Sequence, residues 1–170
     1  MPNDIILGDG VFAIGATDVG LTRGGGTLTI ERTYREIGAD GDYGPVKGRI
    51  RKTGSRAKLA MNALEILTTN IPKMYPAVEI TSTEIAPITD TITGKADVED
   101  TDYNDTITWT GKTTAGRSVV ITLKNTINLE NIEWAIVDKE EIISALTYTA
   151  TYDPSTRTVE PWDIVFTDAV

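Results

Sequence analysis

The sequence predicts an antiparallel β-sandwich or barrel with little helix, and three observations lead to this prediction. Threonine accounts for 27 of the 170 residues and often alternates with apolar residues, which is typical of strands with one buried and one polar face. Glycine, proline and aspartate separate these runs as turn residues do. The hydrophobic fraction of 40% over this length is enough for one domain with a core. We therefore expect a single mainly β domain over residues 1–170.

Eight segments carry the strand pattern, with β-branched and aromatic residues in alternation. Three glycines, residues 24–26, precede the first of them. A glycine run before a strand, rather than before a helix, indicates a bend or bulge and not a dinucleotide-binding loop. The predicted strands cover residues 27–34, 44–51, 78–83, 106–110, 118–123, 131–137, 146–152 and 163–167.

Helix evidence is confined to three short segments. Residues 57–69 fit a helical stripe and an alternating strand almost equally well, and propensity alone favours helix. A short flanking α-helix is predicted around 68–75, because threonines at its start can cap it and Pro72 falls in its first turn. A further helical turn is predicted at 138–142.

The composition argues against most catalytic and metal-binding chemistry. The chain has no cysteine and no histidine, which removes thiolate and imidazole groups as nucleophiles, bases and metal ligands. Its net charge of −9 is the opposite of what a duplex-binding surface carries. Residues 1–10 lack the features of a signal peptide, and no apolar run is long enough to span a membrane. We expect a protein that is not an enzyme and binds no cofactor or metal.

Several local patterns suggest chemistry but fit it poorly. Residues 40–44 begin like an EF-hand loop, yet positions 5, 6 and 12 of that loop are Gly, Pro and Arg, so a hairpin tip is the better interpretation. The acidic run 97–105 has the composition of a solvated loop, and 111–114 lacks the first glycine of a P-loop. Glutamate pairs could support glycoside hydrolysis, but an aromatic content of 6% is low for a sugar cleft. The candidate pairs are Glu31 with Glu36 and Glu79 with Glu84.

Three segments, residues 15–50, 57–67 and 129–164, carry a shared resemblance. Their most telling pieces are GATDVGLTRGG from residue 15, DGDYGPVKG from residue 40, and TYDP followed by PWDI near the C-terminus. Together they resemble the major tail proteins, or tail tube proteins, of long-tailed bacteriophages and prophages. The resemblance covers most of the chain. It implies a β-sandwich protomer with one flanking helix, and it favours strand over helix for residues 57–66.

The resemblance implies a structural role in the phage tail, assembled in the cytoplasm of the bacterial host. Family members form hexameric rings that stack into a hollow tube and close a continuous β-barrel around its lumen. Partners would be other copies of the chain, a tape-measure protein, and tail-completion and baseplate proteins, with DNA in transit and no membrane insertion. Six copies would carry −54 charges per ring, which would repel phosphates. The alternative is a soluble β-sandwich binding module, such as a decoration or adhesin domain.

For the tube, the alternation in residues 27–34 divides the strand into two faces. Leu28 and Ile30 would face the core, and the opposite face would face the lumen. Lys47 and Arg49 would then add positive charge, which we expect Glu31 or Glu36 to neutralise across the strands. The predicted lumen-facing residues are Thr27, Thr29, Glu31 and Thr33.

Assembly contacts are predicted in the hairpin loop and at both ends of the chain. Residues 1–14 and 153–170 are expected to be arms that order on neighbouring subunits, and the acidic loop is expected to meet basic residues of the next ring. The predicted inter-ring loop residues are Glu36, Asp40 and Asp42, and the predicted subunit contacts are Arg23, Lys52, Arg56 and Trp162.

Overall fold

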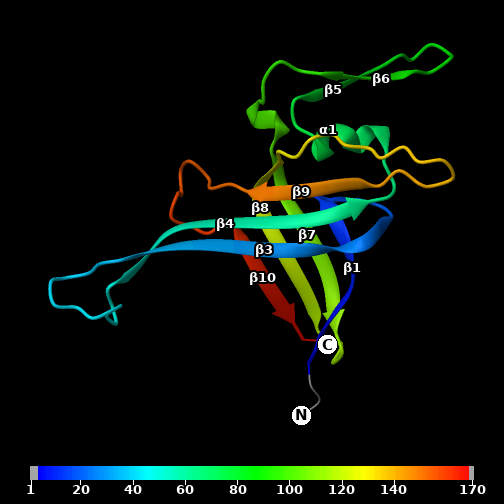
Figure 1. Ribbon diagram of the computed structural model, residues 1–170. Coiled ribbons are helices and arrows are strands. Elements are labelled where there is room, and N and C mark those ends of the chain that lie inside the picture. Colours follow the sequence, from blue (N-terminus) through cyan, green and yellow to red (C-terminus); the bar gives the residue numbers. More distant parts are fainter. Residues whose placement is uncertain (1–3, 169–170) are drawn as a thin grey trace.

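The computed structural model describes residues 4–168 and confirms the predicted mainly β fold, with antiparallel strands and one short helix (Figure 1). Eight strands form one sheet in the order β2-β1-β7-β8-β9-β4-β3, with β10 paired to β8, and β5 and β6 form a separate hairpin. The strands are β1 (Ile6–Ile14), β2 (Thr17–Asp18), β3 (Thr22–Glu36), β4 (Ile50–Ala63), β5 (Val78–Ser82), β6 (Asp90–Gly94), β7 (Asn104–Thr113), β8 (Ser118–Asn128), β9 (Ser144–Ala150) and β10 (Trp162–Thr167). The helical segments are η1 (Thr68–Asn70), α1 (Ile71–Met74) and η2 (Asp100–Asp102).

Strand β8 joins the two layers of the sandwich. Its first half, up to Leu123, pairs with β10, and its last residues, from Thr126, pair with β9. Asn125 lies between these stretches with a φ of 48°, a left-handed conformation that asparagine tolerates better than most residues. Its carbonyl accepts hydrogen bonds from the backbone N–H and the hydroxyl of Thr151. The sheet therefore turns at Asn125, and its two halves face each other across the core.

The core is filled by the inward side chains of both layers. Ile107, Leu123, Leu146 and Tyr148 are at most 1% exposed. The indole of Trp109 lies against Gly10 of β1 and Gly111 of its own strand β7, where a Cβ would approach the ring within 2.5 and 2.3 Å, respectively. Trp109 is itself buried and belongs to the core.

The β3–β4 hairpin is the longest feature of the molecule and projects far from the body (Figure 1). The glycine run 24–26 lies in the first part of β3 and forms the predicted bulge, since the register shifts between Thr22 and Gly26. The hairpin tip spans residues 37–49, so the strand predicted at 44–51 begins only at Ile50. A turn closed by a hydrogen bond from the N–H of Arg49 to the carbonyl of Val46 keeps 46–49 out of the ladder.

Residues 57–63 form part of β4 and not a helix, as the resemblance implied. Pairing with β3 on one side and β9 on the other satisfies the backbone of this stretch and overrides its helical propensity. The helix predicted at 68–75 is confirmed as η1 followed by α1, with Pro72 in its first turn. The expected threonine cap is wrong, because the N-cap residues are Leu67 and Asn70 and neither makes a side-chain cap hydrogen bond. Ile71, Met74 and Tyr75 are buried against the core, which stabilises the fold by about 1.5–3 kcal/mol for each side chain.

The connection from β8 to β9, residues 129–143, contains neither the strand predicted at 131–137 nor the helical turn predicted at 138–142. Buried Asn128 redirects the chain at the end of β8. Its side-chain amide donates to the carbonyl of Met74 at 2.8 Å, and its side-chain oxygen accepts from the N–H of Glu130 at 3.0 Å. This local turn ends the strand pairing before residue 131 is reached.

The two predicted arms need correction. Residues 6–14 form β1, which pairs with β7 and contributes Phe12 and Ile14 to the core. Residues 162–167 form β10, which pairs with β8 within the same chain. Both segments order on their own protomer because the adjacent strands offer unpaired edges. Residues 1–3 and 169–170 of the predicted arms lie outside the described residues.

Candidate assembly surfaces

The outward face of β3, β4 and β9 is polar. Thr27, Thr29 and Glu31 are exposed on it and lie opposite Ala60, Lys58 and Arg56 of β4, respectively. Glu31 pairs with Lys58 at 3.2 Å, and not with Lys47 or Arg49 as predicted. Leu28 and Ile30 are partly buried against the core, so the predicted division of β3 into an apolar and a polar face is confirmed.

The outer hairpin, residues 31–56, is hereafter called the arm, and it is distinct from the terminal arms predicted at 1–14 and 153–170. Thr33, the fourth residue predicted to face a lumen, lies in the arm and pairs with Gly54 just before a bulge at Thr53. The arm contains seven Lys and Arg against four Asp and Glu, a net charge of +3. The rest of the chain contains nine against 21, a net charge of −12. The arm is therefore a basic projection on an acidic protein.

The acidic loop at the tip of the arm is held by its own hairpin. Asp42 accepts hydrogen bonds from the N–H of Ala39 at 2.8 Å and from the guanidinium of Arg49 at 2.7 Å. Asp40 and Glu36 are exposed and make no ion pair within the described part of the chain. Of the three predicted inter-ring residues, Asp42 is thus already neutralised by Arg49, which leaves the other two available to a neighbour.

The predicted subunit contacts are largely occupied within the protomer. Arg23 pairs with Glu141 at 2.9 Å, and the Lys52 ammonium pairs with Glu160. The hydrogen bond from Lys52 holds the pKa of the Glu160 carboxyl below its usual value. Trp162 packs against the core and donates from its indole to Glu160 at 3.0 Å. Arg56 is exposed and is the remaining candidate among the four.

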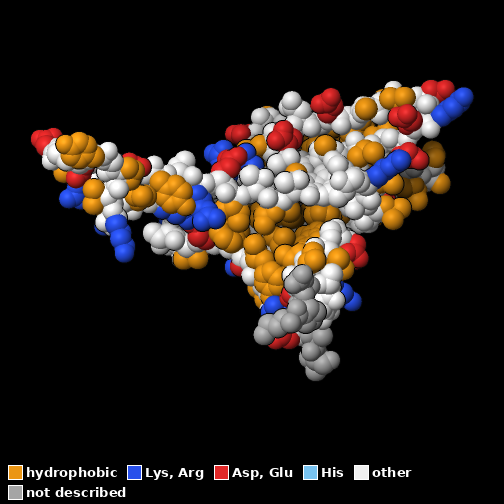
Figure 2. Space-filling model, turned by 60° about the horizontal axis from the view of Figure 1, so that its bottom comes forward, with side chains coloured by type: hydrophobic (Ala, Val, Ile, Leu, Met, Phe, Trp, Pro, Cys, Tyr) orange, Lys and Arg blue, Asp and Glu red, His pale blue; other side chains and the backbone are white. Residues whose placement is uncertain are grey.

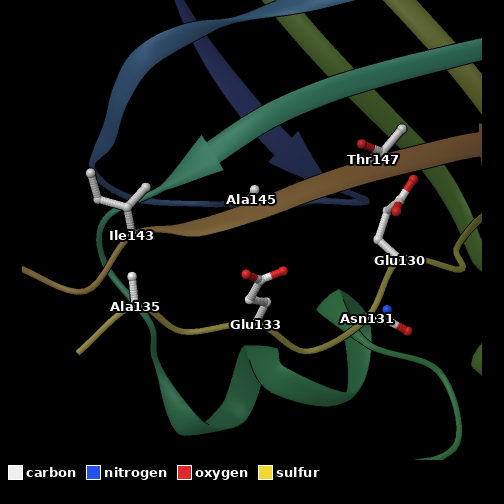
Figure 3. Close-up of a pocket in the computed structure, with 7 residues that line it drawn as sticks. All are labelled: Glu130, Asn131, Glu133, Ala135, Ile143, Ala145 and Thr147. Atoms are coloured by element: carbon white, nitrogen blue, oxygen red, sulfur yellow. The ribbon is translucent and has the colours of Figure 1, made fainter.

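A gap beside β9 was not predicted from the sequence. Residues 144–147 of β9 pair with β4 on one side, while their other edge faces the irregular segment 130–135. The gap has a volume of 520 Å³. Figure 3 shows the carboxylates of Glu130 and Glu133 directed across it towards β9, where Ala145 and Thr147 form the opposite wall. Nothing in the sequence indicated this gap, because the pattern of residues 131–137 predicted a strand there instead of an irregular segment.

An apolar groove of 210 Å³ lies between the two layers, next to β1 and β3. Phe12, Leu28, Trp109 and Ile121 contribute to its walls. Figure 2 shows hydrophobic side chains gathered at the centre of this face, beside the projecting arm. The core is therefore incompletely closed on this side.

The acidic run 97–105 is structural in part. Buried Asp102 forms a capping box with Glu99 and pairs with Lys95 at 2.9 Å. Burial raises the pKa of Asp102, but the N–H of Glu99 and the Lys95 ammonium outweigh it, and the net shift is downwards. Among residues 4–168, no group of three acidic side chains is arranged to hold a metal ion. No helix in the same range is long and apolar enough to cross a membrane.

No family model matches the sequence, and no curated protein matches it.

Proposed function

We propose that this chain is the structural subunit of a phage tail tube, in which copies form hexameric rings that stack around a lumen. The observation that carries the proposal is the long unpaired edge of β3, next to the polar face of β3, β4 and β9. Strand β3 has 15 residues, and β4 is its only strand partner among residues 4–168. An exposed edge of this length is a template for pairing with another chain.

Pairing of this edge with a second copy would extend the polar face from one subunit to the next. The contact would join different surfaces of the two copies, and such a contact produces a ring where repeated rotation closes on itself. In such a ring Thr27, Thr29, Glu31 and Thr33 would line the inner wall. The resemblance of residues 15–50 to tail tube proteins supports the same assignment.

The charges on the polar face change the explanation of how DNA would pass through the lumen, from direct repulsion to weak binding. Glu31 is paired with Lys58, and Arg56 lies opposite it, so this face is not itself strongly acidic. A wall of hydroxyl groups and internally paired charges would offer few free cations to phosphates. Weak binding on this face, together with the net charge of the whole chain, would let DNA slide. The tape-measure protein and the tail-completion and baseplate proteins are the further partners of this proposal.

A soluble β-sandwich binding module is the second candidate, and the apolar groove beside β1 and β3 favours it. Such grooves are the usual form of small-molecule sites. This candidate predicts a monomer that persists at high concentration, with a ligand in the groove.

Negative-stain electron microscopy of the purified protein over a range of concentrations separates the two candidates. Hollow tubes with a regular ring repeat are expected. A monomer at every concentration, in low and in moderate salt, would contradict the tube and leave the binding module.

A further inference from the structure

We propose that the arm of one copy docks in the gap beside β9 of a second copy, where Arg35 and Arg51 of the arm pair with Glu130 and Glu133. This contact deepens the proposed function, because it names the surfaces by which copies recognise each other. The proposed contact rests on a pair of positive side chains near one end of β4 and a pair of negative side chains near its other end.

The first cluster is on the arm. Arg35 and Arg51 lie directly opposite each other in the β3–β4 ladder, so their Cβ atoms are about 5 Å apart on the same face. Both side chains are exposed, and neither makes an ion pair with any residue between 4 and 168. Like charges opposite each other destabilise a strand pair. Two arginines in this position form a site for carboxylates.

The second cluster is in the gap. Glu130 and Glu133 are three residues apart on the segment that lines it, and Figure 3 shows both carboxylates directed into the same space. No cation of the described chain pairs with either of them. Glu130 and Glu133 are exposed, and within the described part of the chain the adjacent edge of β9 at 144–147 has no strand partner on that side. The gap therefore presents two negative charges beside an open sheet edge.

The two clusters cannot meet within one molecule. The arm contains the first residues of β4. The gap lies at the other end of this strand, where Ala63 of β4 pairs with Ser144 of β9. A strand of 14 residues spans roughly 43 Å. Figure 1 shows the arm and the segment 129–143 on opposite sides of the body. An arm that fills the gap must therefore come from another copy.

The position of the clusters also fixes the geometry of assembly. A contact from one end of the molecule to the other end of its neighbour is head-to-tail, and it leaves a free arm and a free gap at the two ends of any open assembly. Association through it continues until a ring closes or a filament forms. Unequal charge along the molecule, with a net charge of +3 on the arm and −12 on the rest, orients the two copies before contact.

Charge reversal and charge swap test the contact on the full-length chain. The variants R35E/R51E and E130K/E133K should each raise the protein concentration needed for association at least about tenfold in sedimentation velocity, since attraction becomes repulsion. The chain that carries all four substitutions should recover association to within about threefold of the unmodified chain. Matched controls make the same charge changes nearby, R32E/K47E on the arm and D138K/E140K beside the gap. They keep both proposed pairs and should associate within about threefold of the unmodified chain.

Thiol cross-linking adds a readout of position, because the chain has no cysteine of its own. With a bis-maleimide, whose length stands in for the two side chains of the ion pair, the variant R51C/E133C should form a ladder of oligomers, whereas R51C alone and E133C alone can form only dimers. Association of either reversed variant at the unmodified concentration would overturn the proposal, as would a swapped chain that stays dissociated while both controls assemble.

The same experiments separate this contact from the tail-tube proposal. Tubes that form equally well in the reversed variants would refute the contact and retain the tube. Oligomers that the reversals disperse, without tubes at any concentration, would retain the contact and refute the tube.

Discussion

Replacement of Asn128 by alanine should destabilise the protein by about 2–4 kcal/mol. The side chain is 1% exposed and makes two hydrogen bonds, to the carbonyl of Met74 and from the N–H of Glu130. Loss of the hydrogen bond from Glu130 costs about 1 kcal/mol net, and the buried Met74 carbonyl left without its donor costs about 1–3 kcal/mol. Because the stability of a domain is about 5–15 kcal/mol, this is a large fraction of the total.

Urea unfolding followed by tryptophan fluorescence measures the loss directly, and the melting temperature should fall by about 5–15 °C. Asn131→Ala is the matched control, because Asn131 is exposed and lies three residues along the same segment; its effect should stay within about 0.5 kcal/mol. A loss of less than about 0.5 kcal/mol in Asn128→Ala would refute the reasoning. It would mean that Asn128 does not set the path of the chain out of β8.

Three further predictions concern the fold. Gly26→Ala should cost about 2–3 kcal/mol in urea unfolding, since its Cβ would come within 2.4 Å of the Ala60 carbonyl oxygen, while Gly38→Ala, with nothing within 4 Å, should be nearly neutral. Tyr75→Phe should cost about 1–2 kcal/mol by leaving the buried Ser144 hydroxyl without its partner, and additivity of Y75F with S144A would argue against that bond. The pKa of Asp102 is lowered in the fold, so its contribution to stability is present above its unfolded pKa and lost as pH falls through the folded value. Acid titration of stability should therefore be shallower in Asp102→Asn, and identical titrations would contradict the assignment.

Alternation in the sequence identified most strands because burial of one face is a local pattern. It failed where local pattern and tertiary partners disagree. Residues 57–63 have helical propensity, but β3 and β9 offer edges on both sides, and the pairing decides. Residues 131–137 have the strand pattern, but Asn128 turns the chain away before any partner is met. Pattern alone does not show whether a neighbouring edge is available.

Strand β1 was not predicted, for a different physical reason. Gly8, Asp9 and Gly10 interrupt its alternation, and Gly10 is needed because the indole of Trp109 occupies the space of a side chain. That requirement comes from another strand. For the candidate assembly residues, too, some properties could be predicted from local pattern and others could not. The exposure of Thr27, Thr29 and Glu31 followed from alternation, whereas the partners of Asp42, Arg23 and Lys52 depended on contacts that a sequence does not display.

A cryo-electron microscopy reconstruction of the assembled protein tests the central claim most directly, because it locates the outward face of β3 in the assembly. The tail-tube account predicts a hollow tube of stacked rings with Thr29 and Glu31 on the wall of the lumen. A tube in which these side chains lie on the outer surface, or a protein that never assembles, would contradict it.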